Sequence, residues 1–178
     1  MGTNKVVLYI AASLDGYIAK ADHSLDWLLA VEGDGGDNGY GAFYATIGTV
    51  VMGRTTYDEV LKLTDEFPYV GKPCYVLTRE NRPPAPHIAY SSEPIETLVP
   101  RLTAEASGDV WLVGGGQLVR DFLAANLIDR VELAVIPTVL GSGIPLFPEG
   151  TPPRDFRLTG VERIGQIAML RYDAVRQA

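Results

Sequence analysis

The sequence predicts an α/β fold: a mixed, mainly parallel sheet that is flanked by helices and ends in an antiparallel strand pair. Short apolar, β-rich runs alternate with helix-like stretches through about the first 125 residues, which is typical of parallel βαβ units. The last fifty residues or so contain strand-like runs with no helix-like stretch between them. That change of pattern predicts the antiparallel pair at the end of the chain.

Four apolar runs predict strands buried in the sheet. The run Val6–Ala12 is continuously apolar and does not alternate, which is typical of a strand covered on both faces. The other three runs are bounded by Gly, Pro or charged residues: Thr49–Met52, Cys74–Leu77 and Val110–Val113.

Three stretches predict helices, and three further runs predict strands. In Gln117–Ala125 the apolar residues Leu118, Phe122 and Ala125 share one helix face. The other predicted helices are Thr56–Leu63 and Ile95–Ala106. The later strands are Arg130–Ile136, Phe156–Ile164 and Ile167–Val175, with the last two forming the terminal hairpin.

Length and composition predict one domain over residues 1–178. With 47% apolar and 21% charged residues, the chain resembles an ordinary globular protein and can bury its own core. The proline-rich segments Arg82–Pro86 and Thr151–Pro153 lie among strands of one predicted sheet. We therefore interpret them as loops and not as domain boundaries.

Charge and cysteine content exclude several classes of protein. A net charge of −7 disfavours nucleic acid as a partner. Cys74 is the single cysteine, which leaves no internal disulfide and too few thiolates for a structural zinc site, so a cytoplasmic location is expected. His23 and His87 lack a metal-binding spacing, and the first apolar run is too short for a membrane span. We expect no metal, no signal peptide and no membrane segment.

Gly114-Gly115-Gly116 lies between a predicted strand and a predicted helix. Glycines at this position let the backbone approach a ligand, and the N–H groups that begin the next helix attract phosphate. A tight strand-to-helix turn without a ligand is the alternative interpretation.

Gly53-Arg54-Thr55-Thr56 also follows a predicted strand and precedes a helix. A guanidinium beside helix N–H donors can bind phosphate bidentately, and a threonine hydroxyl adds a donor. The threonines also fit plain helix capping, because an acid follows each of them three residues later. Capping and phosphate binding are compatible.

Thr78-Arg79 gives a third polar strand end. Ligands of open α/β sheets bind outside the carboxyl ends of the strands, so the three segments are expected at one edge. Two arginines near one phosphate suit the 2′-phosphate of NADPH better than the free hydroxyl of NADH.

The segment from Ser13 to Ala19 leaves the first strand and is a candidate cover for a nicotinamide. Asp15-Gly16 within it is also a common turn dipeptide. Asp15, and Asp37 further along the chain, are candidate proton donors for a reduction.

Four motifs together resemble the dihydrofolate reductase-like superfamily, and more narrowly the riboflavin-biosynthesis reductase branch. They are Ser13–Ala19, Val51–Tyr57, Val113–Gly116 and Ile136–Phe147. The resemblance extends from Val6 to Val175 and matches the C-terminal domain of the bifunctional deaminase-reductase. The zinc signature of the deaminase half is absent from the sequence, so the expectation covers the reductase module alone.

The resemblance implies an NADPH-dependent reductase that acts on a small heterocyclic, ribosylaminopyrimidine-type substrate and pairs as a homodimer. Dihydrofolate reduction and NADPH binding without significant turnover are the alternatives. The residues implied at the adenosine phosphates are Gly53, Arg54 and Thr55, with Thr78 and Arg79 at the 2′-phosphate. Those implied at the pyrophosphate are Gly115, Gly116, Gln117 and Leu118, and those implied at the nicotinamide are Ala12, Gly16 and Ile18. Val113 is a further cofactor-binding candidate.

Overall fold

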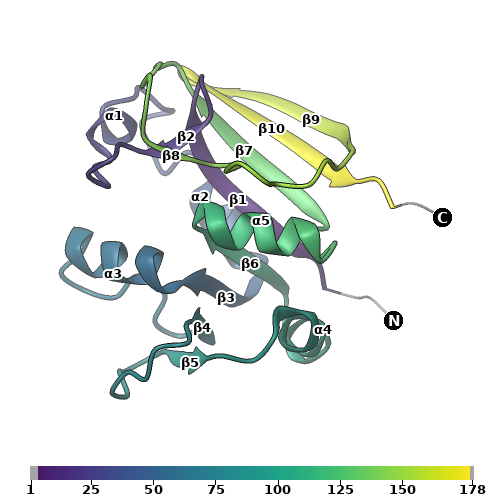
Figure 1. Ribbon diagram of the computed structural model, residues 1–178. Coiled ribbons are helices and arrows are strands. Elements are labelled where there is room, and N and C mark those ends of the chain that lie inside the picture. Colours follow the sequence, from purple (N-terminus) through teal and green to yellow (C-terminus); the bar gives the residue numbers. More distant parts are fainter. Residues whose placement is uncertain (1–3, 177–178) are drawn as a thin grey trace.

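The computed structural model describes residues 4–176 and contains an eight-stranded sheet crossed on both faces by helices (Figure 1). The order of the strands is β5-β4-β3-β6-β1-β7-β10-β9. The strands are β1 Val6–Ser13, β3 Ile47–Gly53, β4 Cys74–Leu77, β5 Ala89–Ser91, β6 Asp109–Gly114, β7 Arg130–Ile136, β9 Phe156–Ile164 and β10 Ile167–Ala174. A separate two-stranded sheet pairs β2 Tyr17–Ala19 with β8 Ile144–Pro145.

Pairing in the large sheet changes from parallel to antiparallel near its end. The strands from β5 to β7 pair in parallel, whereas β10 is antiparallel to both β7 and β9. The predicted mixed, mainly parallel sheet with a terminal antiparallel pair is therefore confirmed. In Figure 1 this pair, β9 and β10, extends away from the helices at the yellow end of the chain.

Five helices connect the strands: α1 Asp26–Leu29, α2 Tyr40–Ala45, α3 Arg54–Leu63, α4 Ile95–Glu105 and α5 Gly116–Ala124. Helices α4 and α5 cover one sheet face, where Leu98 and Phe122 pack on Leu8 of β1. Helices α2 and α3 cover the other face, where Phe43 and Tyr57 pack with residues of β3 and β4. Figure 1 shows α5 in front of the sheet and α2 behind it.

The central strands are apolar throughout because both of their faces are covered. All but the last residue of β3 are buried, and Val50, Val51 and Met52 are fully inaccessible to solvent. Strand β9 is largely exposed, because it forms the edge of the sheet and no helix covers it. Because β3, β4, β6 and β1 pair in parallel, their carboxyl ends meet at one rim of the sheet. Helices α3 and α5 begin at the same rim.

Candidate functional site: a cavity at the carboxyl rim of the sheet

A cavity of about 730 Å³ opens at this rim. Its walls come from the ends of β3, β4 and β6, the first turns of α3 and α5, and the β2–β8 pair. Three polar or glycine-rich strand ends, which the sequence places far apart, thus lie around a single space. A volume of this size is typical of a site for a small ligand or a cofactor.

Helix α3 enters the cavity wall without a capping side chain. Gly53 is its N-cap, with extended backbone at φ −78° and ψ 164°, and no side chain bonds to the first turn. Thr55 and Thr56 are therefore inside the first turn, and the capping role predicted for them from the sequence is wrong. Both threonines line the cavity, so their hydroxyls and the uncapped N–H groups of the helix are available to an anion.

Helix α5 begins in the same way on the neighbouring strand. Gly115 is its N-cap, and again no side chain caps the first turn. Gly114 has a φ of +136°, which a residue with a side chain rarely adopts. At Gly116 a Cβ atom would collide with the carbonyl oxygen of Pro145. The two glycines therefore permit both the sharp turn and the close packing of α5 against the strand pair, with Val113, Gln117 and Leu118 beside them on the cavity wall.

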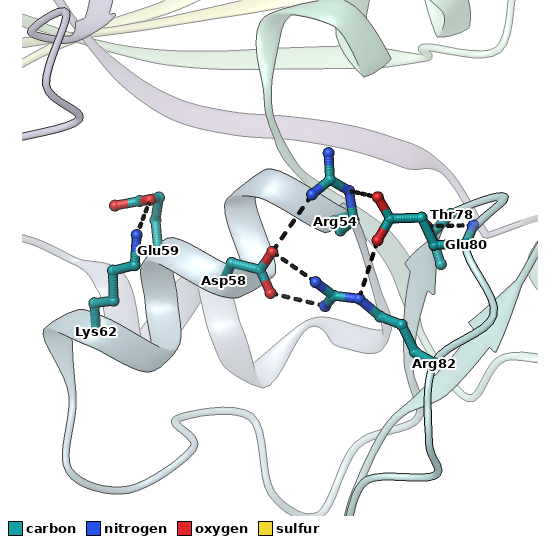
Figure 2. A network of polar contacts seen from close by, with 7 residues as sticks. All are labelled: Arg54, Asp58, Glu59, Lys62, Thr78, Glu80 and Arg82. Atoms are coloured by element: carbon teal, nitrogen blue, oxygen red, sulfur yellow. Dashed lines mark hydrogen bonds and ion pairs between the residues drawn. The ribbon is translucent and has the colours of Figure 1, made fainter.

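Positive charge reaches the cavity from the first residue of α3 and from the loop after β4. Arg54 and Arg79 both line it, next to Thr78. Figure 2 shows that Arg54 is held by two carboxylates: its Nε lies 3.4 Å from Oε1 of Glu80, and its Nη1 lies 3.8 Å from Oδ2 of Asp58. Arg79 forms no ion pair with any residue from 4 to 176. An anion in the cavity thus finds one guanidinium held in place and a second that is not neutralised.

The other part of the cavity wall is apolar. It is formed by the end of β1, the β2–β8 pair and the segment around α1: Ile10, Ala11, Ile18, Ala19, Leu25, Leu28, Ile144 and Pro145. His23 also lines the cavity, from the loop between β2 and α1. The cavity therefore combines a region suited to phosphate groups with a region suited to an uncharged ring.

Two of the residues predicted at the nicotinamide lie outside the cavity wall. Ala12 is buried, with 2% of its surface exposed, and packs into the core beneath α5. Gly16 occupies the turn after β1 with a φ of +86°, and its carbonyl accepts a hydrogen bond from the Leu146 amide. The third predicted residue, Ile18, lines the cavity, as does Ala11 next to Ala12.

Asp15 does not line the cavity and instead binds the loop at Leu140 and Gly141. Its carboxylate accepts hydrogen bonds from the amides of Leu140 (3.1 Å) and Gly141 (2.7 Å), and from the Ser13 hydroxyl (2.6 Å). The hydroxyl and these amides lower the pKa of Asp15 to about 2. A carboxylate this acidic is a poor proton donor at neutral pH, so we do not carry its predicted catalytic role forward.

Asp37 also lies outside the cavity. Its carboxylate accepts hydrogen bonds from the Gly39 amide (3.0 Å) and the Gly41 amide (2.8 Å), at the start of α2. The side chain therefore organises the glycine-rich turn before that helix, where the sequence left the register open. Because Asp37 lies outside the cavity, the structure does not support its predicted role as a proton donor.

Sequence reasoning missed several residues of the wall. Glu80 follows Arg79 directly, so the strand-end argument that found Thr78 and Arg79 would have found it one residue later. Ile144 and Pro145 lie in a quoted motif but had no assigned role. His23 gave no local signal, because a loop between β2 and α1 brings it to the cavity.

Cys74 and the remaining titratable clusters offer no second chemistry. Cys74 is buried in β4, and burial raises the pKa of its thiol to about 12. Within the described residues no group of three or more His, Cys, Asp or Glu side chains is placed to hold a metal ion. No helix in the same part of the chain is both long and apolar enough to cross a membrane.

The fold and the rim cavity define the class of protein. The strand order, with a terminal antiparallel pair and two glycine-started helices at the carboxyl rim, is that of the dihydrofolate reductase-like fold. Residues 4–170 match the family described as the RibD C-terminal domain. The chain belongs to that family, as the resemblance predicted.

Comparisons with individual proteins agree with this assignment. The Bacillus subtilis (strain 168) protein YwjB, an uncharacterized protein, is 47% identical over 169 residues, which is 94% of this chain and 97% of YwjB. A crystal structure from Shewanella sp. PV-4, assigned to riboflavin biosynthesis, has a TM-score of 0.87 and 30% identity, covering 97% of this chain and 99% of that one.

A more distant structure is that of a diaminohydroxyphosphoribosylaminopyrimidine deaminase/5-amino-6-(5-phosphoribosylamino)uracil reductase from Thermotoga maritima. It is 17% identical with a TM-score of 0.71 and shares the fold. The match covers 97% of this chain but 57% of that protein. The chain thus spans little more than half of the bifunctional relative.

Proposed function

We propose that the protein is an NADPH-dependent reductase that transfers hydride to a small heterocyclic substrate of the ribosylaminopyrimidine type. The observation that carries the proposal is the division of one cavity into two parts. One part presents two uncapped helix N-termini together with Arg54 and Arg79, and the other is apolar. This division suits a dinucleotide with an anionic and an uncharged end.

The residues of the cavity wall fit the phosphates of NADPH. Gly116 keeps the start of α5 free of side-chain atoms, and Gly53 does the same for α3, so backbone N–H groups can donate to phosphate oxygens. We assign Gly53, Arg54 and Thr55 to the adenosine phosphates and Gly115, Gly116, Gln117 and Leu118 to the pyrophosphate. Thr78 and Arg79 are assigned to the 2′-phosphate.

The apolar part of the cavity is assigned to the nicotinamide and the substrate ring. The cofactor supplies the hydride. Ile18, Ala11 and Leu28 would exclude water from the reacting atoms and hold the ring faces together. His23 is the side chain we assign as the proton donor, because it lines this cavity and histidine is a common general acid.

The proposed substrate class is supported by the family and by the Thermotoga maritima relative, whose second activity is that of a 5-amino-6-(5-phosphoribosylamino)uracil reductase. Dihydrofolate reduction would be favoured by a carboxylate facing the ring. The acids that line the cavity are Glu59, Glu80 and Asp121, all from α3, α5 or the loop after β4, and Asp37 lies elsewhere. The placement of these acids supports a pyrimidine substrate over a pterin.

The decisive experiment follows NADPH oxidation with a panel that contains a ribosylaminopyrimidine and dihydrofolate, using the wild type, Arg54→Ala and Arg79→Ala. We expect turnover of the ribosylaminopyrimidine with NADPH and a loss of roughly tenfold or more in NADPH affinity in each variant. Arg101→Ala is the control, because Arg101 pairs with Glu93 beside α4 and does not line the cavity. NADPH binding without oxidation of any substrate would instead identify a binding protein.

We also propose that the protein forms a homodimer through its sheet. Strand β9 is the edge of the large sheet and exposes Leu158 and Val161, with 52% and 66% of their surfaces accessible. Apolar side chains on an open edge favour association. Light scattering on the wild type and on Val161→Lys tests this: the wild type should have twice the monomer mass and the variant should dissociate.

A further inference from the structure

Four side chains at the mouth of the cavity form a closed ring of alternating charge (Figure 2). Arg82 binds Asp58 bidentately, with Nη1 to Oδ1 at 2.7 Å and Nη2 to Oδ2 at 2.9 Å, and its Nε lies 3.4 Å from Oε2 of Glu80. Arg54 contacts the same two carboxylates, at Oδ2 of Asp58 and Oε1 of Glu80. Each carboxylate of the ring therefore touches both arginines.

Only half of this ring faces the cavity. Arg54 and Glu80 line the wall, whereas Asp58 and Arg82 do not. Arg82 is the better shielded of the two arginines, with 23% of its side chain exposed against 42% for Arg54. Its bidentate hydrogen bonds hold the pKa of Asp58 below the usual value, so Asp58 stays ionised. Arg82 thus acts on the cavity through its neighbours.

Glu80 has the position in which a carboxylate opposes a 2′-phosphate. It directly follows Arg79 at the end of β4 and lines the same cavity. A carboxylate after such a strand accepts a hydrogen bond from the ribose 2′-hydroxyl of NADH, and it repels the 2′-phosphate of NADPH. The two ion pairs that occupy Oε1 and Oε2 of Glu80 cancel this effect.

The ring as a whole is neutral, since its two arginines balance its two carboxylates. Arg79 then supplies the excess positive charge. Loss of the Arg82 charge would leave Arg54 alone between two carboxylates and give the ring a charge of −1. A phosphate monoester carries about −1.5 to −2 at pH 7, so it would respond strongly to this change, whereas a hydroxyl would not.

We infer that Arg82 is a positioning residue that sets the preference of the cavity for NADPH over NADH, by holding the Glu80 and Asp58 carboxylates in ion pairs and so offsetting their charge near a bound 2′-phosphate. The inference rests on the proposed function. It concerns a side chain that does not itself touch the nucleotide, and it predicts opposite effects for the two partners in the ring. Removing Arg82 weakens the preference, and removing the Glu80 charge strengthens it.

The test is a fluorescence titration of NADPH and NADH into the wild type, Arg82→Gln, Glu80→Gln and the double variant. For Arg82→Gln we expect NADPH affinity to fall roughly tenfold while NADH affinity changes less than about twofold. For Glu80→Gln we expect the ratio of NADPH affinity to NADH affinity to rise roughly three- to tenfold. The double variant should lie close to the wild type, because it removes one charge of each sign.

Two controls separate this role from a structural one. Arg101→Gln breaks the exposed pair with Glu93 (2.7 Å), away from the cavity, and should leave both affinities unchanged. Raising the salt concentration should narrow the difference between Arg82→Gln and the wild type, since exposed charges are screened. If Arg82→Gln does not fold, Glu80→Gln alone still carries the test, because Glu80 is 54% exposed and its loss does not disturb a core.

Unchanged NADPH-to-NADH ratios in both single variants, with a wild type that prefers NADPH, would overturn the inference and leave the proposed function standing. Parallel losses for both nucleotides in Arg82→Gln, not rescued in the double variant, would also overturn it, because they indicate a loop that has lost its shape. A wild type that binds neither nucleotide would overturn the proposed function itself.

Discussion

The amide of Gly141 donates a 2.7 Å hydrogen bond to Oδ2 of Asp15, and so joins the turn after β1 to a loop 126 residues further along the chain. The amide of Leu140 donates to the other carboxylate oxygen at 3.1 Å. Asp15 therefore fixes the base of the β2–β8 pair, from which Ile18 and Ile144 reach the cavity.

This contact predicts a pH dependence of stability. The pKa of Asp15 is about 2 in the folded protein against an ordinary 3.8, so the stabilisation is present above pH 4 and is lost as the pH falls toward 2. Asp15→Asn should be less stable than the wild type at pH 7, and the difference should shrink between pH 4 and 2. Thermal unfolding across pH 2–7 measures it. Asp65→Asn is the control, because Asp65 is exposed and has no hydrogen bond or ion pair with the described residues. A stability difference between Asp15→Asn and the wild type that stays constant with pH would contradict the prediction.

Gly116→Ala should weaken cofactor binding. The added Cβ meets the carbonyl oxygen of Pro145, so the first turn of α5 or the β8 strand must move. Such overpacking costs about 1–3 kcal/mol, and we expect a loss of roughly tenfold in NADPH affinity together with a lower melting temperature. Gly36→Ala is the control, since its nearest contact is an ordinary 3.4 Å to Oδ1 of Asp34, outside the cavity. Equal affinities for the two variants would show that the backbone at Gly116 does not approach the ligand.

His23→Gln should reduce turnover far more than binding. A positioned general acid contributes at least about 100-fold, so kcat should fall by roughly that factor while the affinity for NADPH changes little. His87→Gln provides a matched control, because His87 is exposed and lies away from the cavity wall. Similar kcat values for both variants would remove His23 from the mechanism.

Phe122→Ala should destabilise the fold strongly. Phe122 is fully buried and packs α5 on the central strands, so its truncation should lower the free energy of unfolding by about 3–5 kcal/mol. Leu61→Ala, at a position 47% exposed on α3, should change it by no more than about 0.5 kcal/mol. Urea denaturation with a shared m-value measures both. A small effect at Phe122 would mean that the core relaxes around the missing ring.

The main sheet followed from sequence because its strands are signalled locally. The predicted bounds of β4, β7 and β9 match the structure, and those of β1, β3, β6 and β10 differ from it by a few residues at their ends. Helix α2 was missed, because its first turn lies among glycines and its position depends on Phe43 stacking on Tyr9 at 3.8 Å. Strand β5 of the main sheet, the pair β2 and β8, and helix α1 were missed as well, because each has only two to four residues and so gives little local signal.

In the candidate site, too, the residues with a local sequence signal could be predicted and those that depend on distant contacts could not. Arg54, Thr78, Arg79 and the triple glycine could be predicted because a general rule places ligands at the carboxyl ends of parallel strands. Asp15 was misleading, because an Asp-Gly turn and a catalytic loop look alike in sequence. Only the structure shows that the Asp15 carboxylate accepts hydrogen bonds from the amides of Leu140 and Gly141. The ring that contains Arg82 depends on how a proline-rich loop folds back onto α3, which no local pattern specifies.

The cavity wall draws on segments from Ile10 to Pro148, which lie far apart in the chain and meet at the rim of the sheet. The dinucleotide proposed above would contact many of these segments at once. At a hundred times its dissociation constant such a ligand adds about 2.7 kcal/mol to the free energy of unfolding. Resistance of the protein to proteases should therefore rise when the dinucleotide is added.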